Sequence, residues 1–197
     1  MKKLVIASNN AGKLKEIQHI LAPLDIAIIP QAELAIPACP EPFQTFIENA
    51  LTKARHASQH AGLPAVSDDS GICVDVLGGA PGVYSARFAG EPKSDARNNQ
   101  KLVEVLCNES NRKAHYYCVM VLVRREDDPE PVIAEGRWQG EIISEPRGTG
   151  GFGYDPYFLI PELGKTGAEL PMDLKNQISH RAIALKMLVQ KLKELAT

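Results

Sequence analysis

The first third of the chain alternates short apolar segments with helical periodicities, and this alternation limits the folds that the sequence can adopt. Apolar segments of strand length occur at residues 3–7, 25–29 and 63–67. Between them, residues 11–22 and 43–61 repeat apolar side chains at spacings of three and four, the pattern of an amphipathic helix. Strands that alternate with helices are typical of a sheet covered by helices, so the sequence predicts an α/β fold.

The remaining two thirds of the chain predict more strands than helices. The expected elements are a strand at 72–77, a helix at 94–106, long strands at 114–124 and 131–140, a short strand at 157–160, and a final amphipathic helix from Ser179 to about residue 196. Glycine-rich loops are expected at 78–82 and 146–155. The two long strands are expected to pair antiparallel, because only a short segment joins them. We therefore predict a mixed sheet with flanking helices, in one domain over residues 1–197.

Composition and charge exclude several classes of protein. The 197 residues carry 22 Lys and Arg against 24 Asp and Glu, a formal net charge of -2, which argues against a general nucleic-acid binder. The longest apolar run, residues 116–123, is far shorter than the ~18–20 residues of a membrane-spanning helix. The apolar start of the chain ends at Ser8, too early for a signal peptide. The cysteines are scattered and none forms a C-x-x-C pair, so we expect reduced thiols in a cytoplasmic protein, with no membrane or nucleic-acid polymer among its partners.

The segment from Ser8 to Lys13 joins an apolar strand to a helix, a position where backbone N–H groups and the helix dipole favour an anion. Lys13 adds a positive charge in the first helical turn, where an anion would relieve its repulsion by the dipole. The segment is not a Walker A loop, because Ala7 stands where the first Gly would be and Leu14 replaces the Ser or Thr that holds magnesium. Two interpretations remain open, a phosphate-binding loop and an ordinary N-capped helix with a surface lysine.

Two adjacent carboxylates, Asp68 and Asp69, follow an apolar strand within the sequence Ser67 to Gly71. Adjacent residues of a strand point to opposite faces, so one carboxylate is expected to face a site and the other a helix, a loop or a supporting donor. Carboxylate oxygens suit Mg²⁺, which binds through one or two carboxylates plus substrate phosphates. The alternative is an Asp-rich turn, since Asp-Ser-Gly is favourable turn sequence.

Two residues near the 43–61 helix are candidates to support that site. Lys53 borders the apolar stripe of the helix, from which it can reach a pocket or lie along apolar surface. Glu41, in the Pro-rich segment before the helix, is a candidate second acid beside a metal ion.

Two later segments carry candidate groups for binding a ligand. In the 148–156 loop, glycines flank Phe152, whose ring can stack on a base or pack in the core. Arg181 falls on the apolar stripe of the last helix, at its positive end, and such violations of local rules are expected at functional sites. Its planar fork suits a phosphate, a carboxylate or the oxygen edge of a purine, and Lys175 lies a few residues before it. The alternative is a structural arginine paired with a buried acid.

Taken in this order and spacing, the segments resemble the inosine/xanthosine triphosphate pyrophosphatase family, whose members remove non-standard purine nucleotides. The resemblance covers essentially the whole chain. It rests on residues 8–13 (SNNAGK), 45–50 with Lys53-Ala54, 67–71 (SDDSG), 78–87 (GGAPGVYSAR), 150–156 and Ser179-His180-Arg181. It implies a compact single-domain α/β chain with two lobes around a nucleotide cleft.

The resemblance also implies an activity. The reaction is the magnesium-dependent hydrolysis of ITP, dITP and XTP to the monophosphate and pyrophosphate, which cleanses the nucleotide pool. Members of the family are homodimers, so a second copy of the chain is an expected partner beside the nucleotide.

The site residues implied by the resemblance fall into three groups. Proton transfer and its support are implied for Asp69, Asp68 and Lys53, and magnesium binding for Asp69, whereas Glu41 is a candidate metal ligand from its position in the sequence. The residues implied to hold the phosphates or touch the nucleotide are Ser8, Asn9, Asn10, Ala11, Gly12, Lys13 and Ser70. The residues implied to form the base site are Phe152, Gly153, Tyr154, Asp155, Lys175, His180 and Arg181.

Two other functions remain open from the sequence. One is a nucleotide hydrolase or kinase that releases or transfers the γ-phosphate, and the other is a non-catalytic nucleotide-binding module. The products formed separate the first from a pyrophosphatase, and magnesium-dependent turnover separates the second.

Overall fold

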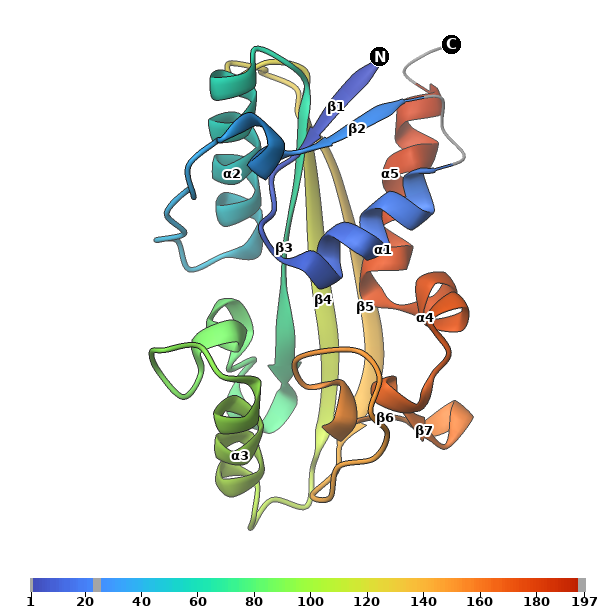
Figure 1. The fold of residues 1–197 in the computed structure, drawn as a ribbon. Coiled ribbons are helices and arrows are strands. Elements are labelled where there is room, and N and C mark those ends of the chain that lie inside the picture. Colours follow the sequence, from blue (N-terminus) through green and yellow to red (C-terminus); the bar gives the residue numbers. More distant parts are fainter. Residues whose placement is uncertain (1, 23–25, 195–197) are drawn as a thin grey trace. The chain divides into compact units, whose positions relative to one another are not determined.

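A computed structural model describes residues 2–22 and 26–194, and the strands of this part of the chain form one seven-stranded sheet (Figure 1). The strands are β1 (Lys3–Ile6), β2 (Ala27–Pro30), β3 (Ala65–Val74), β4 (Lys113–Val123), β5 (Val132–Ile142), β6 (Phe158–Ile160) and β7 (Lys165–Thr166). Their order in the sheet is β2-β1-β3-β4-β5-β6-β7. β1 is parallel to β2 and β3, whereas β6 is antiparallel to β5 and β7, so the predicted mixed sheet is confirmed.

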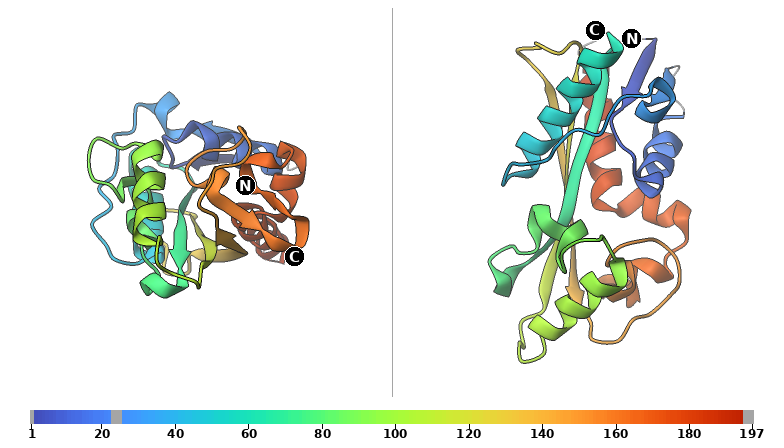
Figure 2. Two further views of the ribbon diagram at one scale, coloured as in Figure 1. Left: turned by 90° about the horizontal axis from the view of Figure 1, so that it is seen from below. Right: turned by 60° about the vertical axis from the view of Figure 1, so that its left-hand side comes forward.

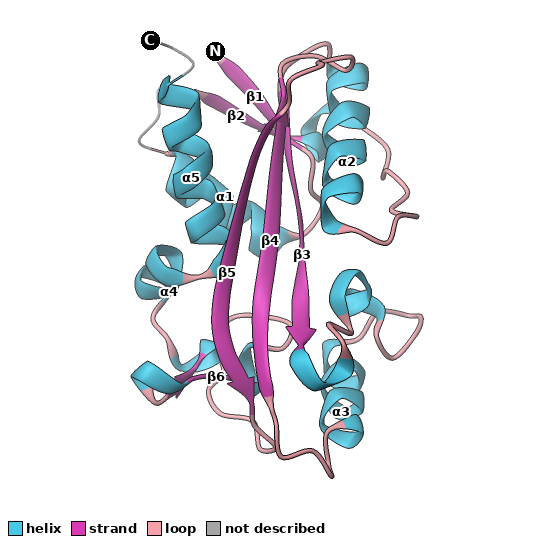
Figure 3. Ribbon diagram, turned by 180° about the vertical axis from the view of Figure 1, so that it is seen from behind, coloured by secondary structure: helices cyan, strands magenta, loops and turns pink. Residues whose placement is uncertain are grey.

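The helices follow the predicted positions closely (Figure 3). They are α1 (Ala11–Leu21), α2 (Phe46–Ala61), α3 (Asp95–Val105), α4 (Met172–Ile178) and α5 (His180–Glu194). The first three begin after a polar residue whose side chain accepts a hydrogen bond from a backbone N–H of the first turn, namely Asn10, Thr45 and Ser94. The sequence did not predict α4, and the predicted start of the second strand at residue 25 and end of the last helix at residue 196 lie outside the described residues. Within those residues, no helix has the length and apolar character needed to cross a membrane.

The largest difference from the prediction concerns β3. The sequence predicts two strands, 63–67 and 72–77, separated by residues 68–71, whereas the structure has a single ten-residue strand from Ala65 to Val74. The apolar pattern breaks in the middle of this strand because Asp68 and Asp69 are buried there as charged groups, with exposed fractions of 1% and 6%. The interpretation of this segment as an Asp-rich turn is therefore wrong.

The chain divides into two units, and neither is continuous in sequence. Unit 1 comprises Met1–Asp69, Cys118–Gly136 and Arg181–Thr197, and unit 2 comprises Ser70–Tyr117 and Arg137–His180. The long strands β3, β4 and β5 contribute residues to both units (Figure 2). The two predicted lobes correspond to these units, and the nucleotide cleft stays a prediction.

In unit 1, helices cover both faces of the strands. α1 and α5 pack on one face through an apolar core that includes Ile17, Val66 and Leu185. α2 packs on the other face, where the hydroxyl of Ser67 donates a hydrogen bond to the carbonyl oxygen of Ala50. Because side chains alternate along β3, Val66 and Asp68 face α1 and α5, whereas Ser67 and Asp69 face α2.

Unit 2 has a core of its own, centred on aromatic rings. The ring of Tyr116 lies 4.7 Å from that of Phe158, and the ring of Trp138 lies 5.2 Å from that of Phe158. Leu102 and Leu106, from α3 and the residue after it, pack into the same cluster. This core places α3 beside the strands of unit 2.

The hairpin that joins β4 to β5 is held by one buried carboxylate. Asp128 accepts hydrogen bonds from the backbone N–H of Arg124 at 2.9 Å and from that of Glu130 at 3.0 Å. It also accepts two from the Arg124 guanidinium, at 2.8 and 2.6 Å. The guanidinium hydrogen bonds, assisted by the backbone donors, hold the pKa of Asp128 well below its usual value.

We predict that Asp128→Ala lowers the free energy of unfolding by about 1–3 kcal/mol near neutral pH, because several donors lose their acceptor. The folded-state pKa is the depressed one, so the stabilisation is present above the unfolded pKa of about 3.9 and is lost as the pH falls through the folded-state pKa. Urea unfolding near neutral pH and in acid should therefore show the difference from wild type shrinking in acid. Asp127→Asn, which alters an exposed aspartate of the same hairpin, is the control, and an equal loss of stability there would contradict the prediction.

Candidate functional site

Asp68 lies at the centre of an ion-pair network buried within unit 1. Its Oδ2 atom is 2.9 Å from Nζ of Lys13 on α1, and it accepts hydrogen bonds from Nε and Nη2 of Arg181 on α5 at 3.3 and 3.2 Å. Arg181 also donates through Nη1 to Glu16 of α1. Burial disfavours the charge on Asp68, but Lys13 and Arg181 outweigh it and hold the pKa of Asp68 well below its usual value. This carboxylate therefore joins α1, β3 and α5.

Asp69, the next residue, has its partners on the other face of β3. Its Oδ1 atom is 3.4 Å from Nζ of Lys53, and its Oδ2 atom accepts a hydrogen bond from Nδ2 of Asn49 at 3.3 Å. Nζ of Lys53 also donates to Oε2 of Glu41 at 2.8 Å. The prediction that the two aspartates face opposite sides of the strand is confirmed.

Charge and burial compete within this second cluster. Burial raises the pKa of Asp69, and the ammonium groups of Lys53 and Lys13 offset only part of the effect. Burial also disfavours the charge on Lys53, but the neighbouring acids, with Asp69 foremost, outweigh it and raise the pKa of Lys53. The cluster thus holds a charged lysine between two acids.

The acids beside Lys53 offer carboxylate oxygens, the type of ligand atom that magnesium prefers. Glu41 and Asp69 direct carboxylate oxygens at the same ammonium group, at 2.8 and 3.4 Å, so a cation already lies between them. Magnesium binds in nucleotide sites through one or two carboxylates, with phosphates and water as the other ligands. Over residues 2–22 and 26–194, no group of three or more His, Cys, Asp or Glu side chains is arranged to hold a metal.

Asn10 organises the candidate phosphate loop, Ser8 to Lys13. Its Oδ1 atom accepts hydrogen bonds from the N–H groups of Gly12 and Lys13 at 2.9 and 3.1 Å, and Oγ of Ser8 accepts one from the N–H of Asn10 at 3.2 Å. The expectation that the first helical turn leaves its N–H groups available is therefore wrong for Gly12 and Lys13, because the asparagine cap bonds both. The interpretation of Lys13 as a surface lysine is also wrong, since its side chain is only 16% exposed and pairs with Asp68. Asn9 and Ala11 are exposed at the start of the helix.

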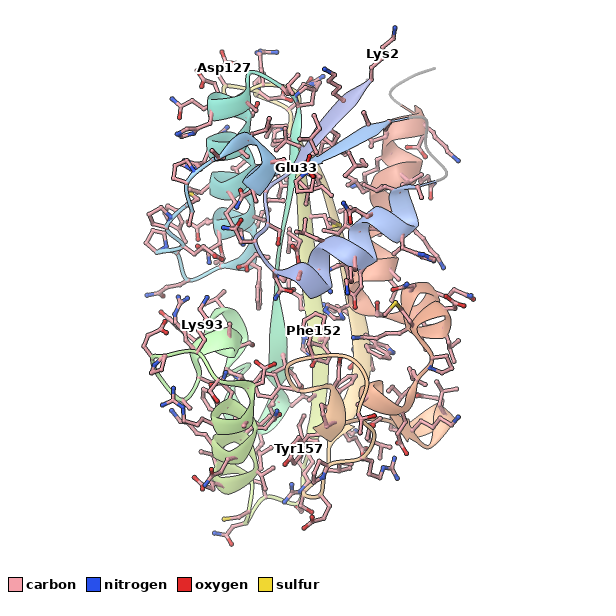
Figure 4. The ribbon with its side chains drawn as sticks, in the orientation of Figure 1. Lys2, Glu33, Lys93, Asp127, Phe152 and Tyr157 are labelled. Atoms are coloured by element: carbon pink, nitrogen blue, oxygen red, sulfur yellow. The ribbon has the colours of Figure 1, made fainter. Side chains whose placement is uncertain are left out.

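In unit 2, the loop from Gly150 to Asp155 is built around the carboxylate of Asp155. Its Oδ2 atom accepts a hydrogen bond from the N–H of Phe152 at 2.8 Å and is 2.6 Å from Nζ of Lys175 on α4. The same ammonium group lies 4.8 Å from the centre of the Phe152 ring, which is labelled in Figure 4. A Cβ at Gly151 would lie 2.0 Å from the Asp155 carboxylate, so only glycine fits there.

Four more of the predicted residues, Gly153, Tyr154, His180 and Ser70, belong to unit 2. The hydroxyl of Tyr154 donates to the carbonyl oxygen of Ser85 at 2.7 Å, and Gly153 has a φ of +64°. His180 is buried, and its ring stacks on that of Tyr116 with 4.6 Å between centres. Ser70 is half-buried on β3.

Arg181 is the predicted base residue whose surroundings differ most from the expectation. It is 1% exposed, and its guanidinium is bonded to Asp68 and Glu16 of unit 1. Lys175 and His180 belong to unit 2. The structure thus shows the pairing with a buried acid that the sequence left open, and contact between Arg181 and a base stays a prediction.

Sequence reasoning missed two residues that complete the unit 1 clusters. Glu16 lies three residues after Lys13 and four before Ile20, so it shares a helix face with both, and this spacing was a readable signal. Asn49 lies four residues before Lys53 on α2 and is 2% exposed. Its position one helical turn before Lys53 was the same kind of spacing signal.

The fold and the two clusters define an α/β protein in which two adjacent acids of β3 pair with lysines of α1 and α2, and in which a glycine loop lies beside an aromatic ring. Comparison with known proteins then gives the family. Residues 4–191 match the model of the Ham1 family, and the chain belongs to that family.

Curated relatives and solved structures agree with this assignment. A dITP/XTP pyrophosphatase of Nitrosomonas europaea is 63% identical over 194 residues, covering 98% of this chain and 96% of the relative. One of Ralstonia nicotianae is 61% identical over 196 residues, covering 98% of each chain. The structure of a HAM1 protein from Coxiella burnetii superposes with a TM-score of 0.92 at 48% identity, covering 98% of this chain and 100% of that one. The predicted family and fold class are confirmed.

We predict that Arg181→Ala lowers the free energy of unfolding by about 3–5 kcal/mol, because it leaves the carboxylates of Asp68 and Glu16 buried without their shared cation. Urea unfolding of the purified variant measures this loss. Lys186→Ala, which removes an exposed cation from the same helix, should change stability by less than about 0.5 kcal/mol. Similar stability for the two variants would show that the buried network contributes little.

Proposed function

We propose that the protein is a magnesium-dependent pyrophosphatase that hydrolyses dITP, XTP and ITP to the monophosphate and pyrophosphate. The observation that carries the proposal is the cluster of Glu41, Lys53 and Asp69, in which two acids flank one lysine. Membership of the Ham1 family supports it, as do relatives at 63% and 61% identity that are named dITP/XTP pyrophosphatase.

The triphosphate is assigned to unit 1. Ser8, Asn9, Asn10, Ala11 and Gly12 form the turn before and at the start of α1, where the helix dipole favours an anion. Lys13 and Lys53 place ammonium groups beside Asp68 and Asp69. Transfer of a phosphoryl or nucleotidyl group depends mostly on positioning and on neutralising charge, and both lysines supply positive charge as pyrophosphate leaves.

The magnesium ion is assigned to Glu41 and Asp69. When bound, it would neutralise phosphate charge and lower the pKa of a coordinated water. Glu41 and Asp69 would hold the metal, and Lys53, whose ammonium group donates to both carboxylates, would supply positive charge to the leaving pyrophosphate.

Asp69 is assigned as the proton acceptor for the attacking water. Asn49 donates a hydrogen bond to its Oδ2 atom and fixes the direction of the carboxylate. Asp68 supports the site indirectly, because it holds Lys13 at 2.9 Å. A positioned general base of this kind contributes ~10²–10⁴-fold in rate.

The base is assigned to unit 2, with Phe152 as the stacking surface and Lys175 as a donor to the 6-oxo group. Nζ of Lys175 lies 4.8 Å from the centre of the Phe152 ring, which places a hydrogen-bond donor next to the proposed stacking surface. A 6-amino group would place a donor against a donor, and sites that rely on such hydrogen bonds discriminate by ~10⁴ or more. The remaining base-site assignments are Gly153, Tyr154, Asp155 and His180 of unit 2 and Arg181, which belongs to unit 1, and Ser70 is assigned to the nucleotide.

Three further assignments complete the proposal. Residues 1–197 act as one domain, supported by the interleaving of the two units along the chain. The protein is a homodimer, supported by large apolar side chains at the surface, such as Ile47 at 41% and Tyr84 at 48% exposure. It acts in the cytoplasm, supported by four cysteines that are all free thiols.

The test is a panel of nucleoside triphosphates assayed with magnesium for pyrophosphate and orthophosphate. We predict pyrophosphate from ITP, dITP and XTP, with far lower rates for ATP, because the 6-oxo group is the one recognised. Orthophosphate without pyrophosphate would instead assign a hydrolase of the γ-phosphate. Tight binding of ITP without turnover would assign a binding module.

Asp69→Asn completes that test. The isosteric amide cannot accept the proton, so kcat for ITP should fall by at least ~10²-fold. Asp173→Asn, which alters an exposed aspartate of α4, should leave kcat unchanged. Full activity of Asp69→Asn would show that Asp69 is not the general base.

We predict that Glu41→Gln raises the magnesium concentration at half-maximal rate by about 10-fold or more, because one anionic ligand is lost. A magnesium titration at saturating ITP measures the shift. Glu33→Gln, at an exposed glutamate earlier in unit 1, is the control and should not shift the curve. An unchanged titration for Glu41→Gln would remove Glu41 from the metal site.

A further inference from the structure

Both polar groups of Gly153 are bonded by side chains of α3. The N–H of Gly153 donates to Oδ2 of Asp95 at 2.8 Å, and its carbonyl oxygen accepts from Nδ2 of Asn99 at 2.9 Å. The three residues belong to unit 2. Neither Asp95 nor Asn99 is among the segments that carry the family resemblance, so α3 holds the glycine loop from outside the recognised motifs.

The two α3 residues are placed by the helix itself. Asp95 is the first residue of α3, directly after the Ser94 cap, and Asn99 follows one turn later on the same face. Asn99 is 6% exposed, whereas Asp95 is exposed. The hydrogen bond from Asn99 is therefore shielded from water and contributes more than the one to Asp95.

These contacts fix the backbone on both sides of Phe152. The N–H of Phe152 is bonded to Asp155 at 2.8 Å, and the next N–H along the chain, that of Gly153, is bonded to Asp95. The peptide groups before and after the ring are thus each held by a carboxylate. Gly153 itself has a φ of +64°, a conformation that glycine adopts without steric strain.

We propose that Asp95 and Asn99 are positioning residues that set the place of the Phe152 ring, and through it the preference for 6-oxo over 6-amino purine nucleotides. The proposal rests on the assignment of the base to the 150–155 loop. Donor and acceptor atoms distinguish the two bases only when the ring that stacks on the base is held at a defined depth and angle. Loss of the α3 contacts frees the Gly153 peptide groups and lets the ring move.

The variants separate the two hydrogen bonds. Asn99→Asp is isosteric but lacks the donor to the Gly153 carbonyl, and Asp95→Ala lacks the acceptor for the Gly153 N–H. Asp95→Asn keeps an acceptor oxygen and is the conservative variant that should retain the wild-type properties. We expect Asn99→Asp to raise KM for ITP and lower the ITP-to-ATP ratio of kcat/KM by about 10-fold, with a smaller change for Asp95→Ala.

The split between KM and kcat tests the positioning role. The proposed general base, Asp69, and the proposed metal ligands lie in unit 1. The kcat of the α3 variants for ITP should therefore change by less than about threefold. A general loss of folded enzyme would instead lower kcat and leave KM and the ratio unchanged. Hydrogen exchange of the 150–155 amides provides a second readout, because Asp95→Ala should speed exchange of the loop.

Asn98 offers a matched control on the same helix. It is also a buried asparagine, and it bonds the carbonyl oxygen of Ala86 at 3.0 Å and the N–H of Ala89 at 2.8 Å instead of the glycine loop. Asn98→Asp removes an equivalent donor from an equivalent environment. It should lower stability to a similar degree without changing the ITP-to-ATP ratio.

The outcomes distinguish this proposal from the proposed function. A wild-type enzyme that prefers ITP, with unchanged ratios in Asn99→Asp and Asp95→Ala, overturns the positioning role alone. The same change of ratio in Asn98→Asp also overturns it, because the effect would then reflect stability. A wild-type enzyme that releases no pyrophosphate from ITP overturns the proposed function, and the positioning role with it.

Discussion

Asp68 is the charge around which unit 1 is organised. A fully buried carboxylate in the middle of a strand is tolerated only when cations surround it, and here Lys13 of α1 and Arg181 of α5 do so. Glu16 provides the second anion for Arg181, so the four side chains balance in charge. The first turns of α1 and α5 are thereby tied to β3 beside Asp69. The position of the candidate phosphate loop depends on this network, because the loop ends at Lys13.

The alternation of a β-strand then gives two neighbouring carboxylates opposite properties. Asp68 meets two cations and has a lowered pKa, whereas burial gives Asp69 a raised pKa on the other face. Environments that separate the pKa values of paired acids are a recurring way to divide roles between them. Asp68 suits a permanently charged anchor, and Asp69 suits an exchange of protons or ligands. A single dipeptide in an extended strand therefore carries one carboxylate with a lowered pKa and one with a raised pKa.

The sequence predicted the elements better than their connections. Caps and apolar periodicity located α1, α2, α3 and α5, because these signals are local. The sequence predicted two strands in place of β3, because two adjacent aspartates are typical of a turn. Their ion-pair partners, which allow them to be buried in a strand, come from α1, α2 and α5. The hydrogen bond from Gly153 to Asp95 joins residues 58 positions apart, and no local sequence pattern predicts it. The resemblance supplied the candidate site residues, but not the buried pairing of Arg181 with Glu16.

In the glycine loop, some residues can be recognised from the sequence as required, whereas the residues of α3 that hold the loop cannot. Gly151 is required because the Asp155 carboxylate occupies the space of a side chain, so its identity is fixed by a partner four residues away. Asp95 and Asn99 bond backbone groups of Gly153, which every residue type except proline possesses, so the sequence of the loop does not reveal these contacts. The conformation of the loop nevertheless depends on both kinds of contact. Under the proposed assignment of the base to this loop, selectivity depends on the loop together with α3, because the position of the Phe152 ring depends on the peptide groups on either side of it.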